Sequence, residues 1–220
     1  MAVMYIMRHG STPFNDPNDP LYPGTQLRAS SEVPLNDDGK EEAKQAARLL
    51  RNRGIVAIFA SDLTRTIQTA TIVNLTLNLP LSLDSRLDTW DLGLLSGQSE
   101  GSDSKGPDAE GPDIDPIIQW YEEHPDERVP GGESFNDFVK RVKLGIQDYE
   151  TQPGGPVLLV THGRIMDVLE YVRSGTGSPL IPEDDRPNPG SIIRVEPGVP
   201  GSAVVKMAAV ETIQEDALRG

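Results

Sequence analysis

The chain has 220 residues, with 20 Lys and Arg against 34 Asp and Glu, and its net charge of −14 argues against nucleic-acid or anionic-membrane partners, since both are polyanions. The absence of cysteine excludes a disulfide scaffold, a thiolate zinc site and a cysteine nucleophile. No apolar run approaches the roughly 20 residues that span a bilayer, and the N-terminus lacks the basic region of a signal peptide. We therefore expect a cytoplasmic protein with a single domain over residues 1–220.

The first elements are a strand, a long loop and a helix. Residues 3–7 form a continuous apolar run that ends at a polar turn, which is typical of a strand buried on both faces. Residues 11–35 are rich in Pro, Ser, Asn and Asp and predict a surface loop. Alanines at helical spacing then predict a helix, which Asn36 or Asp37 would cap and Gly54 would end.

A second strand and helix follow, and then an ambiguous segment. The apolar run 55–60 predicts a strand, and Ser61 after it looks like the cap of a helix. Leucines alternate through residues 74–84, which favours a strand, although the first part could equally be the tail of the helix. We predict a strand near 79–83, and Pro80 would confine it to an edge of the sheet.

The segment 96–116 is rich in Gly, Pro, Ser, Asp and Glu and almost free of apolar residues. It predicts a mobile lid or insertion, extending over 96–133, that includes a short helix at 117–123. Its acidic residues lack the Asp/Asn–Gly–Glu spacing of a calcium loop. Ser134 then caps a strongly amphipathic helix with an apolar stripe.

The remaining pattern is a third apolar strand at 157–160, a helix over 165–172, and two strands at 192–195 and 203–207. Strands alternating with helices predict an α/β fold, with a mostly parallel central sheet and helices on both faces. In such sheets, ligands bind beyond the carboxyl ends of the strands.

Two of the three histidines share one context. His9 and His162 each follow an apolar strand, and each precedes a glycine, Gly10 or Gly163. Parallel neighbouring strands would place both imidazoles on the same rim, and the glycines would allow a sharp turn and the close approach of a ligand. A lone histidine is more often structural, but a matched pair favours a functional site.

Arginines accompany this pair. Arg65 would lie in the first turn of the helix after the second strand, on the same rim. A helix N-terminus favours anions, and guanidinium groups bind phosphate oxygens bidentately. Alone, Arg65 would be read as a surface ion-pair residue, but beside Arg8 and two histidines it predicts a phosphate pocket.

Five motifs, in the same order, resemble the histidine phosphatase superfamily in its phosphoglycerate-mutase-like branch. They are Arg8-His9-Gly10-Ser11-Thr12 with Asn15; Pro34-Leu35 with Gly39; Ser61-Asp62-Leu63 with Arg65-Thr66 and Thr69-Ala70; Gly132-Glu133-Ser134; and Val160-Thr161-His162-Gly163. The resemblance covers roughly residues 3–175, and the ordered set of motifs is far more specific than a lone Arg-His-Gly.

The resemblance implies that His9 is the nucleophile and forms a phosphohistidine. Arg8, Arg65 and His162 would hold the equatorial oxygens of the transition state. Asn15 would bind a phosphoryl oxygen or fix the loop. Phosphate and substrate binding would involve Arg8, Ser11, Thr12, Asn15, Arg65, His162 and Gly163. No metal or other cofactor is expected, because arginines supply the positive charge.

The general acid departs from the family pattern. Members usually carry a glutamate in a segment of the form L-x-E-x-x-x-G, and registration on Gly93 places Thr89 at that position. Threonine cannot donate a proton near neutral pH. Asp88 or, as an alternative, Asp91 would be the acid; otherwise the acid lies elsewhere in the lid or is missing. Glu133 would contact the pocket or orient a pocket residue or the loop backbone.

The resulting expectation is a metal-independent phosphomonoesterase acting on a small phosphorylated substrate, as a monomer or homodimer. A phosphoglycerate-type phosphomutase is the alternative enzyme, although it would need a closed, strongly basic pocket. A catalytically weak module that binds a phosphorylated ligand is the non-enzymatic alternative, and the altered acid position is its support.

Overall fold

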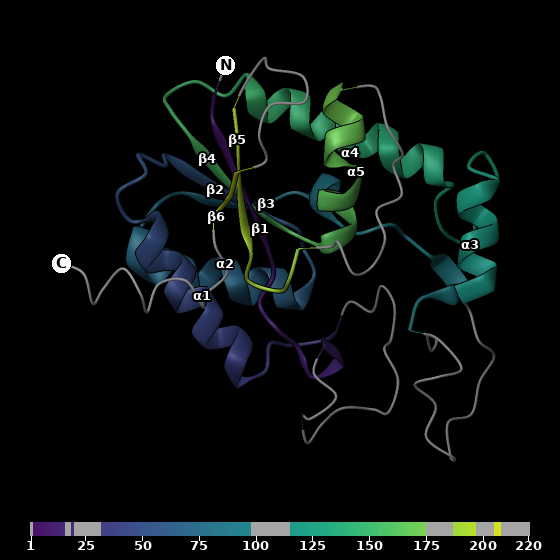
Figure 1. Ribbon diagram of the computed structural model, residues 1–220, viewed down its shortest axis with the longest axis horizontal. Coiled ribbons are helices and arrows are strands. Elements are labelled where there is room, and N and C mark those ends of the chain that lie inside the picture. Colours follow the sequence, from purple (N-terminus) through teal and green to yellow (C-terminus); the bar gives the residue numbers. More distant parts are fainter. Residues whose placement is uncertain are drawn as a thin grey trace.

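The computed structural model describes residues 2–15, 19, 32–97, 115–174, 187–196 and 205–207. Strands in these ranges form one sheet in the order β3-β2-β4-β1-β5-β6 (Figure 1). The strands are β1 (Met4–Arg8), β2 (Ala57–Ala60), β3 (Leu81–Leu83), β4 (Val157–Thr161), β5 (Ile192–Val195) and β6 (Val205–Met207). β3, β2, β4 and β1 run parallel, whereas β5 and β6 are antiparallel additions, so the predicted mostly parallel sheet is confirmed.

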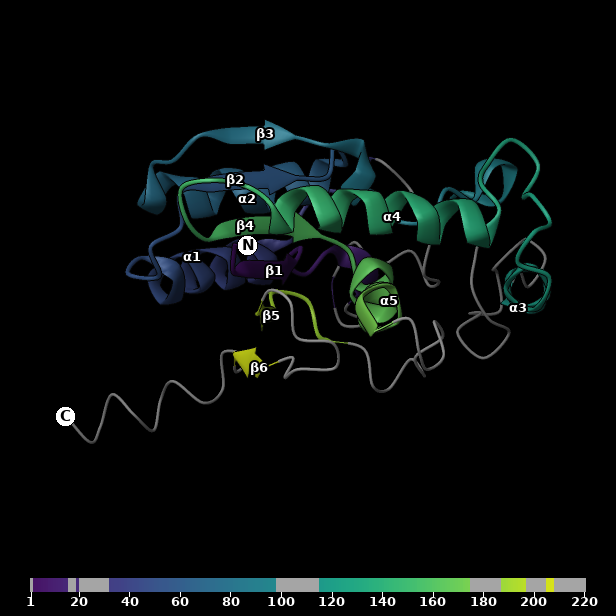
Figure 2. The same ribbon diagram turned by 90° about the horizontal axis from the view of Figure 1, so that it is seen from above.

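Helices cover both faces of the sheet, as predicted. The helices of the described residues are α1 (Asp37–Leu50), α2 (Thr64–Leu77), α3 (Asp115–Glu123), α4 (Phe135–Glu150) and α5 (Gly163–Ser174), with short 3-10 turns η1 (Pro13–Asn15), η2 (Ser85–Leu87) and η3 (Gly93–Leu95). α1 and α2 pack on one face, and α4 and α5 pack on the other (Figures 1 and 2).

The central strand β1 shows why two cores form. Successive side chains of a strand point to opposite faces. Met4 and Ile6 therefore join the core beneath α4 and α5, while Tyr5 and Met7 join the core beneath α1 and α2. Apolar residues at every position of the run are needed because both faces are covered.

The two ends of α1 identify its N-cap and show that Gly54 does not end the helix. The Asn36 side chain accepts a hydrogen bond from the backbone N–H of Gly39 at 2.8 Å, so Asn36 is the N-cap. The helix ends at Leu50, with Arg51 as its C-cap. Gly54 therefore does not end it; with φ of +69°, this glycine forms the turn that leads toward β2.

The N-cap of α2 differs from the predicted Ser61. It is Leu63, with no side-chain hydrogen bond, so Ser61 is not the cap. α2 continues to Leu77 and ends at Asn78 in the left-handed conformation. The ambiguous leucines therefore divide between the helix tail and β3, which lies at the edge of the sheet as predicted.

Much of the predicted lid, residues 98–114, lies outside the described residues, as do most of the predicted loop at 11–35 and the start of the last predicted strand. The described α3 is tied to α5 by an ion pair between Glu122 and Arg164, which is largely shielded from solvent. Among the described residues, no helix combines the length and the hydropathy needed to cross a bilayer.

Candidate active site

Strand register brings the two predicted histidines together. Arg8 of β1 is paired with Thr161 of β4, and the His9 amide donates to the Thr161 carbonyl at 2.9 Å. His9 and His162 thus follow directly after paired positions at the carboxyl ends of parallel neighbours. Their ring centroids are 5.3 Å apart, and both side chains are buried.

The glycine after each histidine provides space rather than a sharp turn, because neither has a positive φ. A Cβ atom on Gly10 would lie 2.4 Å from the carbonyl oxygen of Gly39 at the start of α1. One on Gly163 would lie 3.3 Å from Cζ of Arg8. The first glycine therefore lets the loop pack on α1, and the second makes room for the Arg8 guanidinium.

Hydrogen bonding fixes the state of His9. Its Nδ1 lies 2.8 Å from the Gly10 carbonyl oxygen, which can only accept, so Nδ1 carries the proton and Nε2 keeps its lone pair. Burial lowers the His9 pKa well below 6.5, and the positive charges of Arg65 and Arg8 lower it further. The imidazole is therefore neutral near pH 7 and has a nucleophilic nitrogen.

His162 has the other tautomer, and Ser61 holds it there. Arg65 donates from NH2 to Nδ1 of His162 at 3.2 Å, so the ring proton is on Nε2, which donates to the Ser61 hydroxyl oxygen at 2.8 Å. Sequence reasoning missed this role because a serine after a strand is also typical of a helix cap. The signal in the sequence was that Ser61 directly follows β2, because β2 adjoins β4, the strand that His162 follows.

Two arginines make this rim strongly positive. Arg65 is only 8% exposed, and burial, together with the nearby charge of Arg8, lowers its pKa to about 10. Arg8 donates from NH1 to the Pro187 carbonyl at 2.6 Å. The carboxyl edge of the sheet thus carries two cations and two neutral imidazoles. The two guanidinium groups repel each other, and a bound anion would relieve this repulsion.

Residues of the loop after β1 mainly support its shape. Ser11 donates from its backbone N–H and its hydroxyl to the Glu42 carboxylate, at 2.7 and 2.8 Å. Thr12 donates from its hydroxyl to Oδ1 of Asn15 at 2.9 Å. Asn15 therefore fixes the loop, which was one of its two predicted roles, and the Ser11 hydroxyl proton is committed to Glu42 rather than to a ligand.

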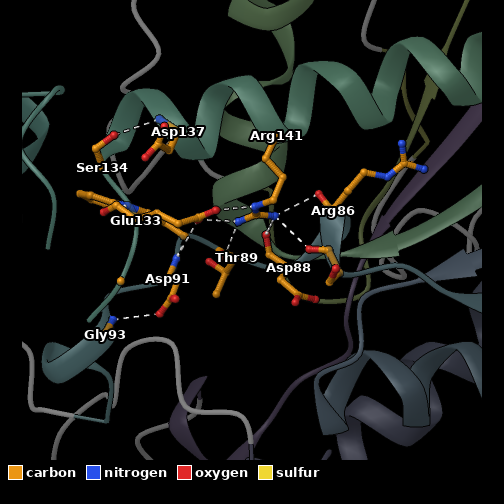
Figure 3. Close-up of polar contacts among 12 residues, drawn as sticks. Arg86, Asp88, Thr89, Asp91, Gly93, Glu133, Ser134, Asp137 and Arg141 are labelled. Carbon is orange, nitrogen blue, oxygen red and sulfur yellow. Dashed lines mark hydrogen bonds and ion pairs between the residues drawn. The ribbon is translucent and has the colours of Figure 1, made fainter. Parts of the chain in front are cut away.

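The two candidate acids differ in their surroundings. Asp88 accepts from the Asp62 amide at 3.2 Å and lies near the Ser61 hydroxyl. Burial and the Asp62 carboxylate raise the Asp88 pKa to about 6, against the opposing effect of that hydroxyl. Asp91 is exposed and accepts from the Gly93 amide at 2.9 Å, as a turn residue does (Figure 3).

Both aspartates border a pocket of about 600 Å³. Its lining residues are Leu63, Ser85, Asp88, Thr89, Trp90, Asp91, Ser96, Gly97, Glu133 and Arg141. Asp88, which lines this pocket, lies near Ser61, and Ser61 is hydrogen-bonded to His162.

Sequence comparison identifies the family. The model of the histidine phosphatase superfamily (branch 1) matches residues 4–196. The chain belongs to this superfamily. One curated relative, from Enterobacter sp. (strain 638), is named "Probable phosphoglycerate mutase GpmB"; it is 33% identical over 170 residues, which cover 77% of this chain and 73% of the relative.

Solved structures with the same fold include phosphatases. A mycobacterial glucosyl-3-phosphoglycerate phosphatase, complexed with VO3, superposes with a TM-score of 0.67 at 22% identity, covering 89% of this superfamily member and 91% of the phosphatase. An alpha-ribazole phosphatase from Shigella flexneri gives a TM-score of 0.67 at 22% identity, covering 88% and 90% of the two chains. The sheet and its helices are thus those of the phosphoglycerate-mutase-like α/β fold.

Proposed function

We propose that this protein is a phosphomonoesterase that works through a phosphohistidine on His9 and needs no metal ion. The observation that carries the proposal is the neutral His9, with its free Nε2 lone pair, beside the buried Arg65 and the half-buried Arg8. The combination supplies a nucleophile and a binding site for the dianion that it attacks. The substrate is a small phosphorylated molecule.

In the first step, Nε2 of His9 attacks phosphorus while the bond from phosphorus to the ester oxygen breaks. The leaving oxygen takes a proton from the general acid, and the Gly10 carbonyl accepts from Nδ1–H and stabilises the charge on the phosphorylated ring. In the second step, water attacks phosphorus and gives a proton back to the carboxylate of the general acid, the bond from phosphorus to Nε2 breaks, and inorganic phosphate leaves, so that His9 and the acid are both regenerated. Arg8 and Arg65 neutralise the equatorial oxygens in both steps.

His162 would join these donors once substrate is bound. In the described site its Nδ1 accepts from Arg65, and burial lowers its pKa. A phosphoryl dianion nearby favours the protonated imidazole, since opposite charges attract. The second ring N–H would then donate to a phosphoryl oxygen. The VO3 complex of the mycobacterial relative supports an oxyanion site in this fold.

Asp88 is the proposed acid. Its raised pKa keeps more of it protonated near neutral pH than an ordinary aspartate, and its nearness to Ser61, the partner of His162, supports the proposal. Asp91 is the weaker candidate because its carboxylate serves the turn at Gly93.

A phosphomutase is the second candidate, since curated relatives are named as phosphoglycerate mutases. A mutase must retain a second anionic group, yet the described pocket wall bears Asp88, Asp91 and Glu133, and Arg141 there is bound to Glu133. We expect a panel of phosphoesters, assayed without metal, to yield inorganic phosphate. Isomerised phosphoglycerate without phosphate release would favour the mutase, and binding without turnover would favour the ligand-binding module.

Replacement of either arginine should weaken catalysis without abolishing folding. Arg8→Ala and Arg65→Ala are each expected to lower kcat/KM by roughly 10²–10³, the range for losing one transition-state donor. Lysine at either position should restore only part of the rate, because an ammonium cannot bind two oxygens in a planar fork. Steady-state kinetics on one aryl phosphate provides the measurement, and an unchanged rate in an alanine variant would remove that residue from the proposed site.

Activity is expected to survive chelation. Arg8 and Arg65 supply the positive charge that a divalent ion provides in metallophosphatases, so dialysis against excess EDTA should leave kcat within about twofold of the untreated enzyme. A metallophosphatase treated in parallel is the control. Inactivation that added divalent cations reverse would contradict the proposal.

A further inference from the structure

An arginine of α4 reaches across to the segment that carries the candidate acids (Figure 3). Its acceptors in that segment are backbone carbonyl oxygens. NH1 of Arg141 donates to those of Ser85, Arg86 and Asp88, at 3.0, 3.1 and 3.0 Å, and NH2 donates to that of Thr89 at 3.1 Å. One side chain thus holds the backbone on both sides of the bond between Asp88 and Thr89.

Glu133 completes the arrangement. It accepts from Nε and NH2 of Arg141 at 2.7 and 2.8 Å, in a bidentate pair with both side chains 19% exposed. Its backbone N–H donates to the Asp91 carbonyl at 3.0 Å, and its carbonyl accepts from the Trp90 indole at 3.3 Å. Glu133 can thus take the orienting role predicted for it. Its carboxylate aligns Arg141, and its backbone contacts Trp90 and Asp91 of the same segment.

The neighbouring contacts leave Asp88 little freedom. Leu87, the residue before it, is anchored where its carbonyl accepts from the Thr161 hydroxyl at 2.6 Å, at the end of β4. The Asp88 carbonyl is held by Arg141, and its carboxylate is held by the Asp62 amide. The Asp88 carboxylate therefore contacts Asp62 from a backbone that is held on both sides.

Arg141 is also poorly suited to bind substrate, although it lines the pocket. Its guanidinium has five N–H groups in a fixed fork, and each of its three nitrogens already donates to Glu133 or to a carbonyl oxygen. An incoming anion would have to displace these bonds.

We propose that Arg141, aligned by Glu133, is the positioning residue for the general acid, acting by fixing the backbone on which Asp88 stands. The inference rests on the proposed function, because it requires Asp88 to donate the proton. A displacement of about 1 Å at a reacting group can cost roughly 10²-fold in rate. Loss of the Arg141 contacts should therefore mainly affect substrates that need the proton.

The test compares an alkyl phosphate with p-nitrophenyl phosphate, whose phenolate leaves without help. Arg141→Lys keeps the charge but cannot reproduce the fork, and Glu133→Gln keeps the size but removes the charge that aligns the arginine. Each is expected to lower the alkyl-to-aryl ratio of kcat by roughly 10- to 100-fold, with the aryl rate changed less than about threefold. Glu133→Gln also covers the case in which Arg141→Lys fails to fold.

Arg86→Lys is the matched control. Arg86 belongs to the same segment, but its side chain pairs with Asp84 at 2.7 Å and with Asp148, away from the pocket. Its replacement should lower thermal stability and leave the alkyl-to-aryl ratio unchanged. An equal change of ratio in Arg86→Lys, or an unchanged ratio in folded Arg141→Lys and Glu133→Gln, would overturn the inference.

A double variant separates the inference from the proposed function. If Arg141 acts through Asp88, then Arg141→Lys added to Asp88→Asn should lower the ratio no further than Asp88→Asn alone. Additive losses would show that Arg141 acts by another route. If Asp88→Asn alone leaves the ratio unchanged, the assignment of the acid fails, and with it the positioning role.

Discussion

His9→Ala is expected to abolish turnover and the formation of the phosphoenzyme. The variant lacks the only atom proposed to bond to phosphorus, and neither Arg65 nor the neutral His162 that accepts from it replaces that atom. Water would have to attack the bound ester directly, without the covalent step that divides the barrier. Rapid quenching of wild-type enzyme with labelled substrate should trap phosphate that is labile in acid and stable in base, as expected for a phosphohistidine.

Stability needs its own control here. His9 is only 6% exposed, so alanine leaves a small cavity beside buried residues. His9→Gln fills more of this space and likewise lacks a nucleophilic ring nitrogen. Both variants should show the circular dichroism of the wild type and retain binding of inorganic phosphate. Turnover near the wild-type rate in either folded variant would contradict the phosphohistidine mechanism.

The pairing of the histidines could be predicted because it depends on local patterns. Each apolar run is a strand buried on both faces, and each strand ends at the residue directly before its histidine. The sequence does not give the register between the two strands, which the pairing of Arg8 with Thr161 shows. Arg65 was predictable for the same reason, as it lies in the first turn of the helix that follows the neighbouring strand β2.

The supporting contacts could not be predicted in this way. Ser61 satisfies the pattern of a helix cap, and only the position of His162, a hundred residues later, shows that its hydroxyl is used elsewhere. Arg141 lies in an amphipathic helix, where an arginine is usually a solvated residue. Its bonds to backbone carbonyls depend on how α4 crosses the segment after β3, which no local pattern encodes.

The pH dependence of alkyl phosphate hydrolysis should report the acid. Burial and Asp62 raise the Asp88 pKa to about 6. A general acid acts in its protonated form, so the rate on an alkyl phosphate should be highest below this pH and fall as pH rises through about 6. Asp88→Asn should not show this fall in rate on the same substrate. The comparison therefore distinguishes the titration of Asp88 from the titration of the substrate itself. An identical profile in wild type and variant would exclude Asp88.

The identity of the acid rests on a comparison of leaving groups in three variants. A positioned acid contributes roughly 10²–10⁴-fold, most for basic leaving groups, so Asp88→Asn should slow an alkyl phosphate by this amount and p-nitrophenyl phosphate far less. Asp91→Asn should leave the alkyl-to-aryl ratio unchanged, because this carboxylate serves the turn at Gly93. Thr89→Glu restores the residue expected from the family at a position lining the pocket, and it should raise the alkyl rate, most clearly when combined with Asp88→Asn. A ratio that shifts with Asp91→Asn would reassign the acid to Asp91, and a ratio insensitive to both asparagine variants would mean that the proton comes from neither aspartate.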